Sequence, residues 1–515
     1  MAHKQTIASG FARVFGAQPA LPHATVVSVE CDIVKGLHAF SIVGLPDKSV
    51  EEAKDRIASA IKNSGLESPK RSNKKIVLSL APAALKKEGA VFDVPLALSF
   101  LLASEQVRFD PKGKLFAGEL ALDGEVRGIR GTLSIAAAAR ERGFTDLYIP
   151  EENAEEASLV GGLHTHPLTS LEATVAALRG DADTIFKPRK RPRHTDTEPA
   201  LDEIRGQESA KRGLEIAAAG RHNIALYGPP GTGKTMLARA AASILPDLTD
   251  EETIEVTTIH SLAGVLQRDA VFRPPLRSPH HTSSYASLIG GGSGGTVRPG
   301  EATLAHRGVL FLDEFPEFHR DVIQALREPL EDGVVSIARS KSSATFPANF
   351  MLIAALNPCP CGFWGTPRCE CMPHIVEKYR RKISGPIADR IDMWVTVPEM
   401  PLESLSSRGK RAGGETEKAR ERIERAREIQ RTRFKNNKKL STNADMRARD
   451  IEAFAELSDK AEAALIEAAT RMRLSPRGYH RTIKLARTIA DLAVSEIIEP
   501  PHMLEALQYR TRELV

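Results

Sequence analysis

The chain has 515 residues, of which 42% are hydrophobic and 27% are charged, and its net charge is +5. This length exceeds what one core usually organises, so we expect roughly two to four domains. No run approaches the roughly 18 apolar residues that span a membrane, and the N-terminal stretch lacks the features of a signal peptide. We therefore expect a cytoplasmic protein with no membrane partner. The net charge alone excludes no other class of partner.

Residues 1–180 read as an α/β domain. β-branched runs at residues 25–34, 74–82 and 146–150 alternate with helical patterns. In the helical pattern at residues 49–65, Ala53, Ile57 and Ile61 fall on one face. Residues 181–200 follow as a basic linker, whose run KPRKRPRHTDTEPA is too polar to pack in a core. This run is either a solvated tether or an arm that contacts nucleic acid.

Residues 201–400 read as a second α/β domain, and residues 401–515 as a helical C-terminal domain. The apolar runs NIALYG, GVLFLDE, NFMLIAALN and MWVTVP are spaced as parallel strands joined by crossovers. In the C-terminal domain, one helical stripe is predicted to contain Ala419, Ile423, Ala426 and Ile429. Ser458 is a candidate N-cap of the helix that follows.

The segment GPPGTGKT matches the P-loop pattern G-x-x-x-x-G-K-[ST] between a predicted strand and a predicted helix. Its backbone N–H groups can surround phosphates, Lys234 can reach the β and γ oxygens, and Thr235 can bind Mg²⁺. This motif predicts an ATP site with Mg²⁺ as cofactor. The candidate nucleotide-binding residues are Gly228, Pro229, Pro230, Gly231, Thr232, Gly233, Lys234 and Thr235.

Polar residues follow two further predicted strands. Asp313 and Glu314 end the run GVLFLDE, where the first carboxylate can hold Mg²⁺ and the second can orient or deprotonate a water. Asn357 ends NFMLIAALN, where its amide can position the same water. Together with the P-loop, these residues predict ATP hydrolysis.

From Leu201 onward the sequence resembles the AAA+ ATPases of the magnesium-chelatase and MCM-like group. The resemblance makes Asn357 the sensor 1 residue and gives VVSIARSKSSATF the place of the presensor-1 hairpin, with Arg339 and Lys341 as DNA-contacting residues. It also makes Arg390, in ISGPIADRIDMWV, an arginine finger that enters a neighbouring subunit, and Arg477 the sensor 2 residue of a helical lid. Spacing alone would favour surface ion pairs for both arginines, and only the resemblance favours the functional roles.

The stretch SLIGGGSGGTVRPGE lies where this group carries an insert facing the channel of the ring. Arg298 would then contact a polymer in that channel, although a plain flexible connection fits the composition nearly as well.

The first domain resembles the substrate-processing domain of Lon proteases over Gly118–Asn153 and in the run KKEGAVFDVPLALS. A Ser-Lys dyad needs a hydroxyl beside an amine. At the serine position the sequence has Ala90, Val91, Phe92 and Asp93, and at the lysine position it has Leu133. We therefore expect an inactive Lon-like fold and no protease activity.

A Lon-like domain without its dyad, followed by a chelatase-like AAA+ module, resembles the ComM/YifB family of Mg-chelatase-like ATPases across the whole chain. The motifs PHHTSSYASLIGGG, LDEFPEF, NPCPCG and SPRGYHRTIKLARTIADLA carry this resemblance. It implies a hexameric ring that acts as a helicase or branch-migration motor on DNA, with recombination proteins as partners, in natural transformation or general recombination.

Four of the five cysteines lie within residues 359–371, as two C-x-C pairs: Cys359 with Cys361, and Cys369 with Cys371. Few cysteines, most of them clustered, indicate a reducing compartment. The cluster could hold a structural Zn²⁺ or consist of free thiols. Four protein thiolates leave no open position for catalysis, and we expect His280 and His281 to be hydrogen-bonding loop residues rather than ligands.

Two other functions remain open. A chelatase-type or protein-remodelling ATPase would use the same nucleotide site without DNA. A nucleotide-binding assembly module with little turnover is a third possibility, which the intact Lys234, Asp313, Glu314 and Asn357 argue against.

Overall fold

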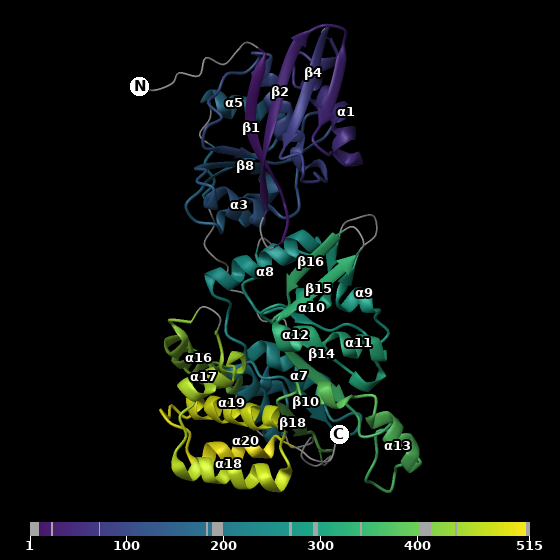
Figure 1. Cartoon of the computed structure of the whole chain (residues 1–515), viewed down its shortest axis with the longest axis vertical. Coiled ribbons are helices and arrows are strands. Elements are labelled where there is room, and N and C mark those ends of the chain that lie inside the picture. Colours follow the sequence, from purple (N-terminus) through teal and green to yellow (C-terminus); the bar gives the residue numbers. More distant parts are fainter. Residues whose placement is uncertain are drawn as a thin grey trace. The chain divides into compact units, whose positions relative to one another are not determined.

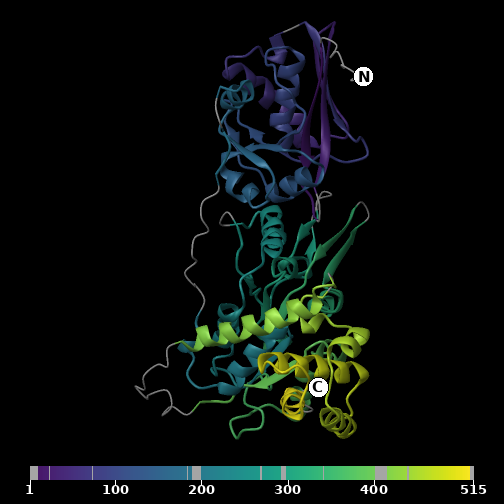
Figure 2. The same cartoon turned by 90° about the vertical axis from the view of Figure 1, so that its left-hand side faces the viewer.

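The computed structural model describes residues 10–21, 24–71, 73–181, 184–187, 199–266, 270–291, 297–339, 342–400, 414–437 and 440–510. The chain divides into two compact units (Figures 1 and 2). Unit 1 contains Met1–Arg193 and Thr253–Val271, and unit 2 contains His194–Glu252 and Phe272–Val515. Most of the basic linker expected at residues 181–200 lies outside the described residues.

Unit 1 contains a four-stranded mixed sheet in the order β1-β2-β4-β3. Strands β1, β2 and β4 pair antiparallel, and β3 is parallel to β4. Alternate residues of the strands are buried, as expected for a sheet with one face on a core. The strands are β1 (Phe11–Gln18), β2 (Thr25–Lys35), β3 (Ala39–Val43) and β4 (Lys74–Ala81).

The helices of unit 1 supply much of its core. Helix α1 (Lys48–Asn63) buries Ala53, Ile57 and Ile61, the face predicted from the sequence. Helix α2 (Asp93–Ala103) is apolar nearly all round and almost wholly buried. The other helices of this unit are α3 (Thr132–Glu141), α4 (Ala154–Ser158) and α5 (Leu171–Arg179).

A second, parallel sheet of unit 1 has the order β5-β8-β9. Its strands are β5 (Lys114–Phe116), β8 (Asp146–Pro150) and β9 (His164–Leu168), and a short ribbon of β6 (Glu119–Leu120) and β7 (Val126–Arg127) accompanies them.

Unit 1 also contains the greater part of helix α8 (Asp250–Ala263), which comes from the middle of the predicted ATPase domain. The N–H of Gly131 donates to the Ser261 hydroxyl at 2.9 Å, and Ile254 packs against the core of this unit. The sequence did not predict this placement, because a helix pattern shows an apolar face but not its partner.

Unit 2 is built on a five-stranded sheet in the order β11-β14-β17-β10-β18, in which every neighbouring pair is parallel. Its strands are β10 (Ile224–Tyr227), β11 (Leu276–Arg277), β14 (Val309–Leu312), β17 (Met351–Leu356) and β18 (Met393–Thr396). Strands β14 and β17 are buried at every position, as continuous apolar runs predict for a sheet covered on both faces. The four strands predicted in this region are confirmed.

Two short antiparallel pairs accompany this sheet. β15 (Val334–Arg339) and β16 (Ser342–Pro347) form a hairpin, and β12 (Gly290–Gly291) pairs with β13 (Arg298–Pro299). The helices of this part of unit 2 are α6 (Glu208–Gly220), α7 (Lys234–Ile244), α9 (Tyr285–Leu288), α10 (Glu301–Leu304), α11 (Arg320–Ala325), α12 (Arg327–Asp332), α13 (Pro373–Arg380) and α14 (Gly385–Ala388).

The C-terminal part of unit 2 is helical, as predicted. Helix α16 buries Ala419, Ile423 and Ala426, but Ile429 is only partly buried and Gln430 takes its place in the buried stripe. The Gln430 amide donates to the carbonyl of Ala219 at 3.1 Å, which satisfies a polar group in the core. The helices are α16 (Glu415–Phe434), α17 (Ala448–Phe454), α18 (Asp459–Met472), α19 (Pro476–Leu492) and α20 (Pro500–Gln508).

Ser458 occupies the N-cap position of α18, as predicted, but its hydroxyl makes no capping hydrogen bond. The hydroxyl contacts the Glu499 carboxylate at 3.1 Å instead. In the described part of the chain, no helix combines the length and the apolar character that a membrane crossing requires.

Candidate functional site

The predicted P-loop lies between a strand and a helix of unit 2. Strand β10 ends at Tyr227 and helix α7 begins at Lys234. Between them, Gly231 and Gly233 have φ values of +78° and +88°, a region that side chains disfavour. The loop therefore ends at a helix N-terminus, which is the arrangement that binds phosphate through backbone N–H groups.

The Lys234 ammonium is held inside this loop. It donates to the carbonyl oxygens of Gly228 and Pro229, both at 2.7 Å, and to Oδ1 of Asn357 at 3.1 Å. Burial lowers the pKa of Lys234 to about 8, although the Asp313 carboxylate opposes this effect. In the bound state, phosphate oxygens of a triphosphate would replace these neutral oxygen atoms as the partners of the amine.

The predicted magnesium ligands contact each other directly. The Thr235 hydroxyl donates to Oδ2 of Asp313 at 2.8 Å. This contact follows from the sheet, because β14, β17 and β10 are adjacent and parallel and present their carboxyl ends at one edge. The structure therefore brings Lys234, Thr235, Asp313 and Asn357 together, from three different strand ends.

Glu314 has a left-handed backbone, with φ of 51°, which is uncommon for a residue other than glycine. Its Oε2 lies 3.2 Å from Nδ1 of His281. His280 instead contacts the Thr282 hydroxyl at 2.9 Å. The sequence suggested hydrogen-bonding roles for both histidines, but it gave no sign that His281 would meet the candidate catalytic carboxylate.

Arg390 and Arg477 lie together on another part of unit 2. Both guanidinium groups contact Glu331 of the same chain, Arg477 at 3.3 Å. Arg390 is buried, and this burial lowers its pKa, as do the nearby Arg327, Arg477 and Arg481. Arg477 is exposed. The structure thus brings together two arginines that lie far apart in the sequence.

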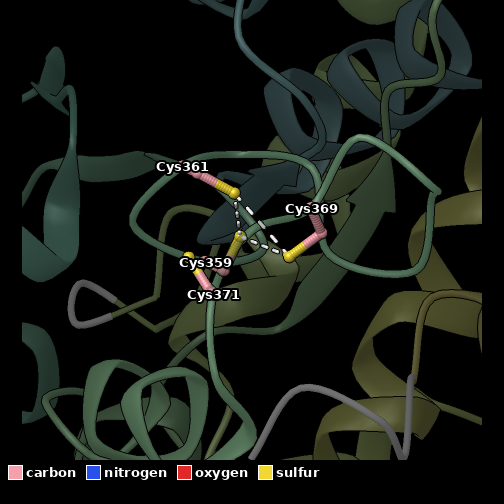
Figure 3. A group of neighbouring side chains, drawn as sticks. All are labelled: Cys359, Cys361, Cys369 and Cys371. Atoms are coloured by element: carbon pink, nitrogen blue, oxygen red, sulfur yellow. Dashed lines mark hydrogen bonds between the residues drawn. The ribbon is translucent and has the colours of Figure 1, made fainter.

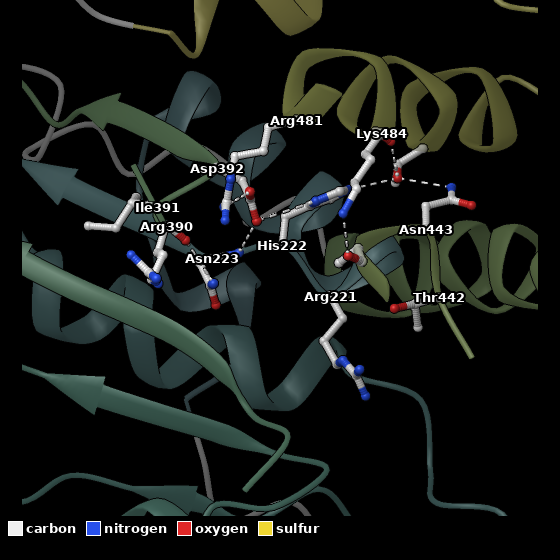
Figure 4. Close-up of polar contacts among 12 residues, drawn as sticks. Arg221, His222, Asn223, Arg390, Ile391, Asp392, Thr442, Asn443, Arg481 and Lys484 are labelled. Atoms are coloured by element: carbon white, nitrogen blue, oxygen red, sulfur yellow. Dashed lines mark hydrogen bonds and ion pairs between the residues drawn. The ribbon is translucent and has the colours of Figure 1, made fainter. Parts of the chain in front are cut away.

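These arginines line a cavity of about 490 Å³ that includes no P-loop residue. In Figure 4, Arg481 and His222 converge on Asp392, which follows Arg390 by two positions. Burial alone would raise the pKa of Asp392, but the Arg481 guanidinium holds it well below its usual range. The cavity wall is therefore rich in fixed charge.

The four clustered cysteines point toward one another (Figure 3). Their Sγ atoms all lie within 4.8 Å of one another, in the loop between β17 and α13. Cys359 is buried, and the other three cysteines are partly buried. No disulfide joins them, so four sulfur ligands are available to one metal ion.

Two of the three residues expected to contact DNA lie on short strands of unit 2. Arg298 is exposed on β13. Arg339 ends strand β15, and Lys341 lies outside the described residues.

In unit 1, the Asp93 carboxylate receives two hydrogen bonds from Arg56, at 2.7 and 3.0 Å, and Leu133 is fully buried. The segments that resemble those bearing the Lon dyad therefore contain an ion pair and a buried core residue.

Three family models match successive parts of the chain. The model described as Subunit ChlI of Mg-chelatase matches residues 29–153, that of Magnesium chelatase, subunit ChlI, matches residues 200–405, and that of its C-terminal part matches residues 413–510. Competence protein ComM of Haemophilus influenzae is 41% identical over 498 residues, which cover 95% of each chain. The chain belongs to the ComM/YifB family of magnesium-chelatase-like proteins.

Other relatives agree with this family. YifB of Escherichia coli is 40% identical over 495 residues, or 95% of this chain and 94% of that protein. A magnesium-chelatase 67 kDa subunit of Chlorobaculum parvum is 28% identical over 163 residues, 31% of this chain and 23% of that subunit. Membership of this family makes the chain an AAA+ ATPase of the ComM type, for which ATP and Mg²⁺ are the expected cofactors.

Proposed function

We propose that the chain is the subunit of a hexameric ring that uses ATP hydrolysis to move along DNA, as a helicase or branch-migration motor in recombination and natural transformation. The single observation that carries the catalytic half of this proposal is the convergence of Lys234, Thr235, Asp313 and Asn357 at the edge of the parallel sheet. The name of the relative ComM, a competence protein, supports the biological half.

In the nucleotide site, each residue has a distinct role. The P-loop N–H groups and Lys234 bind the phosphates. Thr235 and Asp313 would hold Mg²⁺, which would supply positive charge beside the γ-phosphate. Glu314 orients or deprotonates the attacking water, and Asn357 positions it. For Glu314 to act, its contact with His281 has to open or rearrange.

Arg390 and Arg477 supply positive charge to the site of a neighbouring subunit. Both arginines contact Glu331 and line a cavity that contains no P-loop residue. They therefore act on the nucleotide of one neighbouring subunit rather than on the nucleotide of their own P-loop. The triphosphate of that partner would replace Glu331 as their counterion. Burial around Arg390 strengthens such a contact, since charge interactions weaken in water.

DNA would be held by basic side chains on and beside two short strand pairs. Arg339 at the end of β15, Lys341 beyond it and Arg298 on β13 are the proposed contacts. Contact between such side chains and phosphates is independent of base sequence and weakens with salt. A motor that moves along any DNA needs this kind of contact.

Two further proposals complete the description. The four-cysteine cluster binds a structural Zn²⁺, because four sulfur ligands fill the tetrahedral coordination that this ion prefers in structural sites. Residues 1–180 have a Lon-like fold without protease activity, since none of residues 90–93, around the expected serine position, has a hydroxyl group, and Asp93 among them pairs with Arg56. Reduced cysteines agree with a cytoplasmic protein.

A chelatase-type or protein-remodelling ATPase is the second candidate. The similarity to the magnesium-chelatase 67 kDa subunit favours it, but that similarity spans only 31% of this chain. The two candidates share the nucleotide site and differ in the substrate.

Steady-state ATP hydrolysis with single-stranded, duplex and four-way-junction DNA, at two salt concentrations, separates these candidates. The variant Glu314→Gln serves as the blank. We expect one DNA form to stimulate hydrolysis strongly, and this stimulation to fall at higher salt. Hydrolysis that depends on Glu314 but responds to no DNA would favour a protein substrate instead.

A further inference from the structure

The sulfur atoms of the cysteine cluster have the spacing of a tetrahedral metal site. The Zn–S bond of about 2.3 Å places two sulfurs of a tetrahedron about 3.8 Å apart. Sγ of Cys359 lies 3.9 Å from that of Cys369, and Sγ of Cys361 lies 3.7 Å from that of Cys369. The sulfurs of Cys359 and Cys361 are closer, at 3.3 Å. All these distances far exceed the disulfide bond length of about 2.05 Å.

Other groups of the loop hold the sulfurs in place. The backbone N–H groups of Phe363 and Glu370 donate to the sulfur of Cys361, which is how outer groups orient and stabilise metal-bound thiolates. Arg368 lies over the Phe363 ring, 4.0 Å from its centroid, and pairs with Glu399 at 3.0 Å. The loop is therefore pinned at several points besides the cysteines.

This loop also forms a wall of the P-loop. Gly362, the residue after Cys361, has φ of +87°, and a Cβ atom there would lie 2.4 Å from Cδ of Pro230. Real Cβ atoms do not approach a neighbour so closely, so the backbone at Gly362 packs directly on the P-loop. Cys359 follows Asn357, the residue that contacts Lys234, by two positions.

We infer that the metal site controls the shape of the ATP pocket: Zn²⁺ bound by Cys359, Cys361, Cys369 and Cys371 fixes the loop that supports Pro230 and Asn357, and binding of nucleotide depends on it. The inference rests on the proposed zinc site and nucleotide site, and it does not depend on DNA. Without the ion, four sulfurs at these distances lose the centre that holds them together, and Gly362 can move away from Pro230.

The metal content of the purified full-length protein tests the first step. Inductively coupled plasma mass spectrometry should find about one zinc per chain in the wild type. The double variant Cys369→Ser, Cys371→Ser should lose this zinc, and Cys31→Ala should retain it, because Cys31 is buried in the core of unit 1 and the cluster belongs to unit 2. A zinc-free wild type, or a double variant that keeps its zinc, would overturn the metal site.

The contact with the P-loop is tested by two glycine variants that keep all four cysteines. Gly362 and Gly365 both have φ of +87°, but a Cβ at Gly365 would meet nothing within 4 Å. Gly362→Ala and Gly365→Ala therefore carry the same backbone strain, and only the first one displaces Pro230. Both should contain zinc at the wild-type level.

Binding of a fluorescent ATP analogue, measured without DNA, gives the readout. We expect Gly362→Ala and the double cysteine variant to raise the dissociation constant of the analogue by about tenfold or more, which corresponds to about 1.4 kcal/mol of binding free energy. Gly365→Ala should bind like the wild type. Equal affinity in both glycine variants would refute the coupling while leaving the zinc site intact. Loss of DNA stimulation with normal zinc and nucleotide binding would refute the motor and leave this inference standing.

Discussion

Arg390 forms an ion pair with Glu331 of its own chain, and the guanidinium is buried while about half of the carboxylate side chain is exposed, at 6% and 47%. Since Arg477 meets the same carboxylate, one anion neutralises two cations. An anion brought by another subunit could replace Glu331 at this cavity. This arrangement leads to a prediction about how subunits share an active site.

Two inactive variants should restore activity to each other when they are mixed. Lys234→Ala removes the phosphate-binding amine, and Arg390→Ala removes the charge that acts across the interface. In rings assembled at random from equal amounts, roughly a quarter of interfaces combine an intact P-loop with an intact arginine. ATP hydrolysis by the mixture should reach about that fraction, against little for either variant alone. An inactive mixture would show that Arg390 serves its own subunit.

Glu314→Gln should abolish hydrolysis and preserve binding. Because the carboxylate is the proposed general base, its loss should lower the turnover number by about 10²- to 10⁴-fold. The matched control is Glu317→Gln, a nearby carboxylate that pairs with Lys382 at 2.9 Å. The control should keep at least about half of the wild-type turnover, since exposed ion pairs contribute little. Turnover numbers and analogue affinities measure the two effects, and equal losses in both variants would contradict the assignment.

Binding of ATP should take up protons at mildly alkaline pH. Burial lowers the pKa of Lys234 to about 8, so part of this amine is neutral at about pH 9 in the free protein. Bound phosphates favour the charged ammonium and raise this pKa again, so a proton enters from the buffer. Calorimetry in buffers of different ionisation enthalpy measures the uptake. Lys234→Met should remove it, and uptake that persists in this variant would assign the proton to another group.

The same pKa has a consequence for the stability of the free protein. In the unfolded chain the amine has its ordinary pKa, so between about pH 8 and pH 10.5 the unfolded state binds more protons at this residue. The unfavourable contribution of Lys234 therefore diminishes as pH rises through this window. Compared with Lys234→Met, the wild type should gain free energy of unfolding over the window. A constant difference in urea denaturation would contradict this.

Charge removal from the β15–β16 hairpin should weaken the response to DNA. The double variant Arg339→Ala, Lys341→Ala should retain basal hydrolysis and show less stimulation by DNA. Its plot of log DNA affinity against log salt concentration should have a slope smaller in magnitude by about 2, since each lost phosphate contact removes about 1. Arg431→Ala, an exposed arginine paired with Glu428 on α16, is the control. Fluorescence anisotropy with labelled DNA measures the affinity. Equal binding by the double variant and the wild type would remove the hairpin from the DNA path.

A buried ion network should be essential to the C-terminal helices. Asp491 is fully buried and receives Arg433 and Arg487, the latter at 3.0 Å. Asp491→Ala would leave two cations without their partner and should lower the free energy of unfolding by about 3 to 5 kcal/mol. Glu428→Ala, which removes only an exposed pair, should cost less than about 1 kcal/mol. Urea denaturation compares them, and similar costs would contradict the network's role.

Much of the nucleotide site could be predicted because local rules determine it. A P-loop needs its own glycines and lysine, and the carboxyl ends of parallel strands meet at one edge. The contacts of Thr235 with Asp313 and of Lys234 with Asn357 follow from these rules. The strand positions followed equally from continuous apolar runs.

Contacts between segments far apart in the sequence could not be predicted. His281 meets Glu314, and Glu331 meets both arginines, through tertiary packing that leaves no periodic signal. The core position of Gln430 shows the same limit, because an apolar pattern does not show which polar residue finds buried partners. The cysteine spacing indicated a cluster, but only the structure revealed that Gly362 rests on Pro230.

Movement of DNA strands tests the central claim most directly. The purified protein, with ATP and Mg²⁺, is incubated with a labelled four-way junction and with a forked duplex, and the products are separated on a native gel. We expect ATP-dependent branch migration or strand separation that Glu314→Gln abolishes. ATP hydrolysis at the wild-type rate with no movement of any DNA strand would contradict a DNA motor.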